Sequence, residues 1–501
     1  MTQDSEISEL KNTSLTLYAF YLRNSIDRGF ENTVPEASRI WEKITDLGNT
    51  RHISELQNLY SKLICYETNQ YHPEIEDRQL TDYFPLLKNP DESLDFSLLS
   101  EPELEIRATL SPYRYHDSYL IDLNLYSENS INPTQLKKFN SQYQLFSPLL
   151  ENYLGKTLFF YAEVSNSQSD YSDLAKTCAS QLFDVEKESI KLVSDRLFNC
   201  PLFIYDNGET NTHKQQHLII WVNDRSIEYF EKQDKFYEWL SYLICSRHKI
   251  LYAYDRSRSR YNDAKPYYEK IEQNINKFSE NVRASDRLEK FKELLRELPE
   301  LSLKYGQLVR EIEDHKNTIK TNLQNYQRSN TELKELPDSN ITFSEDFLTL
   351  INNKFIPQIE ADLSFLTPIK SLFQELLNNI RSIVQIDQIE SDRQLQEQLR
   401  IEAEKSEERA NTIEGWIAFF GTGLAVSGVS AGVVSDPSQT IVKTLNINAP
   451  SFCQSDELAQ FLCTNSFDVV FHLIVGLIVA IPAAIFIRLI PREQGTGNRE
   501  Q

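Results

Sequence analysis

Methionine, basic residues and closely spaced cysteines are scarce in this chain of 501 residues. Met1 is the only methionine, which excludes every motif with an internal methionine. No Cys-x-x-Cys pair, Gly-x-Ser-x-Gly elbow, HExxH motif or dinucleotide fingerprint occurs. Lys and Arg number 52 against 74 Asp and Glu, a net charge of −22 that repels phosphate backbones. We therefore expect no nucleic-acid partner, no cofactor and no enzyme activity.

Apolar residues are concentrated near the C-terminus. Residues 469–487 (VVFHLIVGLIVAIPAAIFI) carry no charged side chain, and a helix of this length spans about 28 Å, close to a bilayer core. Residues 413–434 (IEGWIAFFGTGLAVSGVSAGVV) form a second apolar segment, which holds five of the thirteen glycines. Two such neighbouring segments predict a transmembrane hairpin with membrane lipid as its partner. Buried helices of a soluble domain are the alternative.

Basic residues flank this hairpin unevenly. Six lie just outside the two spans and one lies between them: Arg400, Lys405, Arg409, Arg488, Arg492 and Arg499 against Lys443. Because positive side chains favour the cytoplasmic side, both termini are expected inside and the loop 435–467 outside. The first residues, MTQDSEISEL, lack the basic and apolar regions of a signal peptide. We therefore expect an integral protein of the inner or plasma membrane with cytoplasmic N- and C-termini.

The cysteines agree with this topology. Four are isolated in the cytoplasmic part and are expected to be free and buried: Cys65, Cys178, Cys200 and Cys245. Cys453 and Cys463 lie ten residues apart in the outer loop. They are candidates for a disulfide there, although two free thiols fit the spacing equally well.

Small residues line two faces of the first predicted span. The candidate helix-packing face, on which helices approach closely in lipid, consists of Gly421, Ala425, Gly428 and Gly432. The roughly opposite face is the candidate pore lining and consists of Gly423, Ser427 and Ser430, with Asp436 expected at the outer mouth. A hairpin has only two helices, so small residues on both faces favour a homo-oligomer. Tight packing within a monomeric hairpin is the alternative.

Upstream of the predicted hairpin, the spacing of apolar residues changes from one region of the chain to the next. Residues 1–100 read as mainly helical, whereas 119–125, 157–164, 202–205 and 218–222 predict strands and 172–183 and 189–197 predict helices between them. From about residue 232 the chain reads as helix, interrupted by a turn at 337–340 and a predicted Thr342–Glu345 capping box. The fold class is thus an α+β or α/β cytosolic domain, a long helical or coiled stalk, and a C-terminal two-helix transmembrane hairpin. Their expected bounds are 1–230, 231–412 and 413–490, with a cytosolic tail over 491–501.

This layout, with a stalk helix that runs directly into two C-terminal spans, resembles the CorA-type divalent-cation channels. The resemblance concerns the order of parts over the whole chain. The family's Gly-Met-Asn signature is missing, because the outer end of the first span reads SAGVVSDPSQ. The resemblance implies a homo-oligomer with a pore lined by the first span, and a divalent cation as the transported ion. It assigns no metal-ligating residue here.

Two further patterns suggest ligands. The clearest basic concentration comprises Arg247, His248, Lys249, Arg256, Arg258 and Arg260. It predicts either an anionic ligand, such as a nucleotide, or a solvated helix face paired with carboxylates. His213 and His217 have the spacing of two metal ligands on a helix, but their polar surroundings favour an exposed loop.

Two functions therefore remain open from the sequence. The first is ion conduction by an oligomeric, CorA-like membrane protein. The alternative is a membrane-anchored cytosolic sensor, effector or scaffold without transport activity.

The packing face of the first span generates a prediction. Gly428→Leu is expected to weaken assembly, because a bulky side chain blocks close helix approach and lipid offers no compensating hydrophobic gain. The mass of the detergent-solubilised assembly measures this. An unchanged oligomer would show that the face packs only within its own hairpin.

Overall fold

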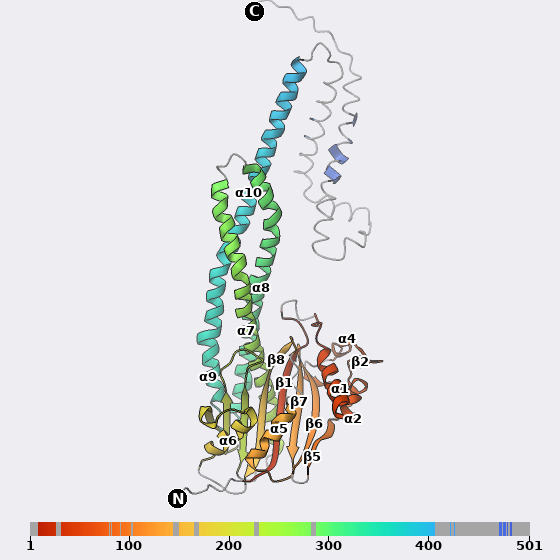
Figure 1. Ribbon diagram of the computed structural model, residues 1–501, viewed down its shortest axis with the longest axis vertical. Coiled ribbons are helices and arrows are strands. Elements are labelled where there is room, and N and C mark those ends of the chain that lie inside the picture. The colour runs from red at the N-terminus through yellow and green to blue at the C-terminus, as the bar shows by residue number, and fades with distance from the viewer. Residues whose placement is uncertain are drawn as a thin grey trace, which may run out of the picture. The chain divides into compact units, whose positions relative to one another are not determined.

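The computed structural model describes residues 9–26, 32–79, 81, 83–90, 92–101, 104–143, 150–164, 170–224, 230–281 and 287–405, and a few positions between 421 and 482. The chain divides into two compact units, Met1–Arg381 and Ser382–Gln501, and each is described by itself. The first unit begins with a mixed α/β sheet domain and continues into long helices, as the sequence predicts (Figure 1).

Within the described residues, nine strands form one sheet in the order β4-β6-β7-β1-β8-β11-β10-β9, and β5 pairs with β6. The strands are β1 (Leu10–Leu22), β4 (Tyr83–Pro85), β5 (Leu94–Glu101), β6 (Leu104–Tyr115), β7 (Ser118–Ser127), β8 (Tyr153–Val164), β9 (Leu192–Leu197), β10 (Cys200–Asp206) and β11 (His217–Asn223). Every pairing is antiparallel except that of β8 with β11. A small separate hairpin joins β2 (Tyr66–Glu67) and β3 (Gln70–Tyr71).

Four of these strands, β7, β8, β10 and β11, lie over the four segments that the sequence predicts as strands. Two regions differ from expectation. Within the region 1–100 that was expected to be mainly helical, residues 10–22 form a central strand and residues 83–85 and 94–101 form further strands of the sheet. Residues 192–197 form an edge strand instead of a helix. In β1, Leu15–Leu22 is buried on both faces, so its apolar residues run continuously and hide the alternation of a strand. In β9, only two of six side chains are buried, and a two-residue turn with positive φ at Phe198 and Asn199 sets the hairpin with β10.

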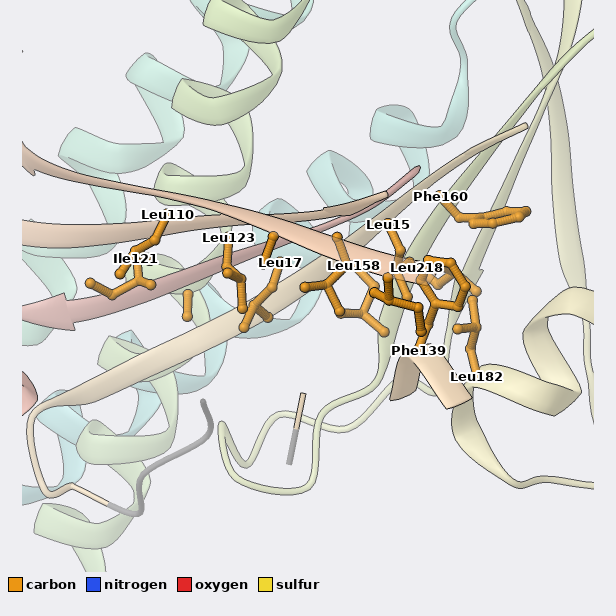
Figure 2. Packing of buried hydrophobic residues seen from close by; sticks show 14 of the residues in the cluster. Leu15, Leu17, Leu110, Ile121, Leu123, Phe139, Leu158, Phe160, Leu182 and Leu218 are labelled. Atoms are coloured by element: carbon orange, nitrogen blue, oxygen red, sulfur yellow. The ribbon is translucent and has the colours of Figure 1, made fainter. Parts of the chain in front are cut away.

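One face of the sheet is covered by the shorter helices. They are α1 (Arg39–Arg51), α2 (Ser54–Gln57), α3 (Leu59–Lys62), α4 (Pro73–Glu76), α5 (Leu136–Tyr143) and α6 (Ser172–Phe183), the last over the residues predicted for it. Figure 2 shows Leu17, Leu158 and Leu218 from neighbouring strands in one row, with Phe139 of α5 and Leu182 of α6 beside them. These side chains form the main hydrophobic core.

The opposite face of the sheet packs on α7 (Phe230–Asn281). Aromatic rings make this interface: Phe159 of β8 and Trp221 of β11 both lie 5.9 Å, centroid to centroid, from Phe236. Phe20 of β1 lies 5.8 Å from the ring of His248 further along the same helix. Both faces of the central strands are therefore covered.

The long helices pack on one another beyond the sheet. Helix α7 lies along α8 (Arg287–Lys334), and α9 (Phe343–Leu350) continues through a π-helical turn, Ile351–Phe355, into α10 (Ile356–Lys405). Tyr254 of α7 stacks on Phe355, with ring centroids 4.0 Å apart, and the Tyr305 hydroxyl of α8 donates to the Leu366 carbonyl over 2.8 Å. The π-helical turn ends two residues before Pro357, whose missing N–H and ring interrupt ordinary α-helical hydrogen bonding.

A carboxylate of the sheet caps α9. Asp195 of β9 is buried and accepts hydrogen bonds from the backbone nitrogens of Thr342 and Phe343 over 2.7 and 2.9 Å. It also accepts one from the Thr342 hydroxyl over 2.6 Å. The capping box predicted for Thr342 and Glu345 was wrong, because the Thr342 hydroxyl turns to Asp195 and makes no cap hydrogen bond of its own. The predicted turn before it is present and pairs with β9 through Asn340 and Arg196.

This cap generates a prediction. Asp195→Ala is expected to lower the free energy of unfolding by about 0.5–2 kcal/mol, the range for loss of an N-cap side chain. Urea unfolding followed by tryptophan fluorescence measures it. Ser194→Ala, an exposed neighbour on the same strand, is the matched control. Equal midpoints for the two variants would contradict the role of the cap.

Candidate functional site

Most candidate residues of the predicted hairpin lie outside the described residues: Gly423, Ser427, Ser430, Asp436, Gly428, Gly432, Cys453 and Cys463. Gly421 and Ala425 are described, and both are helical and exposed. No helix in the described part of the chain is long and apolar enough to cross a membrane. The hairpin therefore stays a prediction.

The four cysteines expected to be free and buried are so: Cys65, Cys178, Cys200 and Cys245. The histidine pair does not come together. His213 is exposed in its loop, while His217 is buried at the start of β11. Within the described residues no group of three or more His, Cys, Asp or Glu side chains is gathered that could hold a metal ion.

The basic concentration of α7 is largely ion-paired. The pairs are Arg247–Asp206, Lys249–Asp117, Arg258–Asp362 and Arg260–Glu311. Pairing with carboxylates, one of the two predictions, is thus confirmed for these four. The expected solvation was wrong for Arg247, His248 and Lys249, which are buried between helix and sheet.

A buried polar network crosses this interface. The Thr157 hydroxyl of β8 lies 2.8 Å from His217 Nδ1 and 2.9 Å from His248 Nε2. The Gln215 amide, oriented with its nitrogen toward His248, donates to Nδ1 over 3.0 Å and accepts from Arg247 over 2.7 Å. His248 therefore carries its proton on Nε2 and donates it to Thr157, whose hydroxyl donates to His217. This one arrangement of protons satisfies every hydrogen bond between Gln215, His248, Thr157 and His217.

Both histidines of this network are held neutral. Burial lowers the pKa of His217 well below its ordinary value, and the charge of Arg247 acts in the same direction. Burial, Arg247 and His217 together lower the pKa of His248 likewise. Because a protonated ring would lose an acceptor nitrogen that the network uses, neutrality and hydrogen bonding agree.

A glycine makes room for the network. Gly155 of β8 has φ of +144°, and a Cβ at this position would lie 2.3 Å from His248 Nδ1. The pairing of β8 with β1 shifts register next to it, between Phe20 and Tyr21. The glycine at this bulge therefore lets the histidine ring approach the strand backbone.

A second cluster of buried charge lies beside α4. Arg23 pairs with Glu76 over 2.6 Å and with Asp77 over 2.9 Å, and the Tyr119 hydroxyl donates to Glu76 over 2.7 Å. Burial raises the pKa of Glu76, while Arg23 beside it acts in the opposite direction. Because these side chains form ion pairs and hydrogen bonds with one another, we interpret the cluster as structural.

A pocket lies beside α7. Its volume is about 400 Å³, and it lies where the β6–β7 turn meets α7 and α8. Its lining comprises Tyr115, His116, Glu238, Trp239, Tyr242, Cys245, Ser246, Lys249, Asn322, Asn325, Arg328 and Ser329. Volumes of this order are typical of small-molecule sites.

Cations and aromatic rings share this pocket. The Arg328 guanidinium lies 5.6 Å from the ring centroid of Trp239, which lies 5.8 Å from that of Tyr242. Lys249 is bonded to Asp117 of the β6–β7 turn, and although burial disfavours its charge, Asp117 raises its pKa. Burial raises the pKa of the Cys245 thiol to about 11, so this cysteine is protonated and no nucleophile.

Sequence reasoning missed this pocket. Its α7 residues do share one helix face at three-to-four spacing, Glu238, Trp239, Tyr242, Cys245, Ser246 and Lys249, so a signal was present. What the face meets depends on α8 and on the β6–β7 turn, which are distant in sequence. Comparisons of the chain with protein-family models, with curated proteins and with solved structures found no match.

The glycine contact generates a prediction. Gly155→Ala is expected to lower the free energy of unfolding by about 2–5 kcal/mol, because backbone strain and a clash with His248 add. Gly208→Ala is the matched control, since Gly208 has φ of +72° but a Cβ there would meet nothing within 4 Å; it should lose only about 1–2 kcal/mol. Urea unfolding compares them, and equal losses would rule out the clash.

Proposed function

We propose that this protein is a membrane-anchored cytosolic sensor or effector. Its sheet domain and long helices hold a ligand pocket, and its two C-terminal apolar segments anchor it as a hairpin. The observation that carries the proposal is the Asp195 cap, because it attaches the sheet to the start of the helix that leads toward the membrane segments.

A second attachment supports this coupling. Arg247, a member of the buried network, lies over the ring of Phe347 in α9, with its guanidinium carbon 5.0 Å from the centroid. Tyr326 of α8 contacts the same ring at 5.3 Å. Helices α7 and α8, which line the pocket, therefore both contact α9 through side chains. A shift of α7 relative to α8 would change these contacts of α9.

The chain order supplies the membrane part of the proposal. Helix α10 is described as far as Lys405, and the first predicted span begins at residue 413. The charge asymmetry around the spans favours cytoplasmic N- and C-termini. A ligand-dependent change in the long helices would then act on the hairpin from the cytoplasmic side.

Ion conduction by a CorA-like homo-oligomer is the second candidate. It is favoured by Phe365 and Leu372 of α10, which lie one heptad apart and are 49% and 55% exposed. A second copy of the chain would cover them. In such an assembly Gly423, Ser427 and Ser430 remain the proposed pore lining, and a divalent cation or another ion the proposed cargo.

The topology is the test of the anchored protein. In intact cells, after reduction, an impermeant maleimide is expected to label the natural chain at Cys453 and Cys463 of the outer loop. The Cys453→Ser/Cys463→Ser chain should stay unlabelled, because its remaining cysteines are buried.

The control places a thiol on the opposite side. Leu303 of α8 is 57% exposed, so Leu303→Cys in the doubly substituted chain should be labelled only after permeabilisation. Labelling of Leu303→Cys in intact cells, or none at the loop cysteines after reduction, would refute the proposed topology.

A further inference from the structure

We propose that the pocket between the β6–β7 turn, α7 and α8 binds a mononucleotide, with its phosphate at Arg328 and Lys249 and its base on Trp239 and Tyr242. This inference deepens the proposed function, on which it rests for the role of the pocket, by naming the class of ligand that the sensor takes.

The first argument is the charge of Arg328. The neighbouring cations of α7 have carboxylate partners, Asp117 for Lys249 and Asp206 for Arg247. Among the residues that the structure describes, no carboxylate forms a salt bridge with Arg328. In a chain with a net charge of −22, an arginine at the edge of a pocket that forms no salt bridge can bind an anion. A guanidinium matches two phosphate oxygens in one plane.

Lys249 supplies the second cation from inside the pocket. Its side chain is 7% exposed, and its ammonium group donates to Asp117. An ammonium group has three N–H donors, so two remain for a ligand oxygen. Asp117 thus fixes the position of the ammonium group and keeps it charged, without using all of its donors.

The aromatic side chains supply the surface for a planar ring. Trp239 and Tyr242 belong to adjacent turns of α7, and Tyr115 of β6 lies 5.3 Å from Tyr242. Tyr115 is held by a hydrogen bond of 2.6 Å between its hydroxyl and that of Ser241. Stacking on aromatic rings of this kind is a general source of affinity for a nucleotide base. Inorganic phosphate alone would leave this surface unused.

The size and polarity of the pocket narrow the class of ligand. About 400 Å³ lies near the lower end of ligand pockets, which suits one nucleotide better than a dinucleotide. Asn325 offers both a donor and an acceptor for a base edge, and the Glu238 carboxylate can accept from ribose hydroxyls. These groups lie in the same pocket as the cations.

The test is calorimetric titration of the detergent-solubilised full chain with AMP, GMP, CMP and UMP in turn, and with inorganic phosphate and the matching nucleoside. At least one mononucleotide is expected to bind about tenfold or more tightly than either of its parts. Arg328→Ala should weaken that binding about tenfold to a hundredfold, as does loss of a charged hydrogen bond. Trp239→Ala should weaken it about fivefold to a hundredfold.

Arg310→Ala is the matched control, because Arg310 is an exposed arginine of the same helix outside the pocket; it should bind like the natural chain. The proposal is overturned if no mononucleotide binds more tightly than phosphate and nucleoside, or if Arg328→Ala binds as Arg310→Ala does. Circular dichroism confirms that the variants fold. Binding in detergent is independent of membrane topology, so failure here and failure of the labelling experiment are distinguishable.

Discussion

The structure of the first unit depends on one constraint: the central strands of its sheet are apolar on both faces, so both faces must be covered. Leu17 and Leu158 meet the short helices on one side, while Phe20 and Phe159 point to the other. Covering the second face requires α7, which runs on past the sheet. The long helices are therefore attached to the sheet because its second apolar face must be buried, and large aromatic side chains make that contact.

Burying α7 on the sheet also buries its polar residues. Arg247, His248 and Lys249 belong to the same turn, and each finds its partners on strands or turns of the sheet. Since an unpaired polar group in such an interface is unfavourable, the network specifies how the helix seats on the sheet. Gly155 is the steric counterpart, because the ring of His248 occupies the space where any other residue would place a side chain.

The same seating creates the proposed site. The helix face that carries Trp239 and Lys249 is completed by α8 and by the β6–β7 turn. Further along α7, Tyr254 stacks on Phe355 of the π-helical turn that leads into α10. Ligand binding and the orientation of the long helices would therefore share elements. The proposed sensor function follows from this sharing, together with the apolar C-terminal segments that the sequence displays.

The sequence by itself determined the order of parts, because local periodicity survives without knowledge of neighbours: the alternation over 119–125 and the apolar runs over 157–164 and 218–222 are strands, and 172–183 is a helix. The sequence pattern was misleading for β1, because a strand that is buried on both faces shows no alternation of apolar and polar residues. It was also misleading for β9, because this edge strand carries few apolar residues. Only the tertiary structure decided that Asp195, rather than Glu345, serves the start of α9, and that Arg328 comes to lie over Trp239. Such pairs join residues far apart in the chain, and their chemistry depends on a distance that no local pattern encodes.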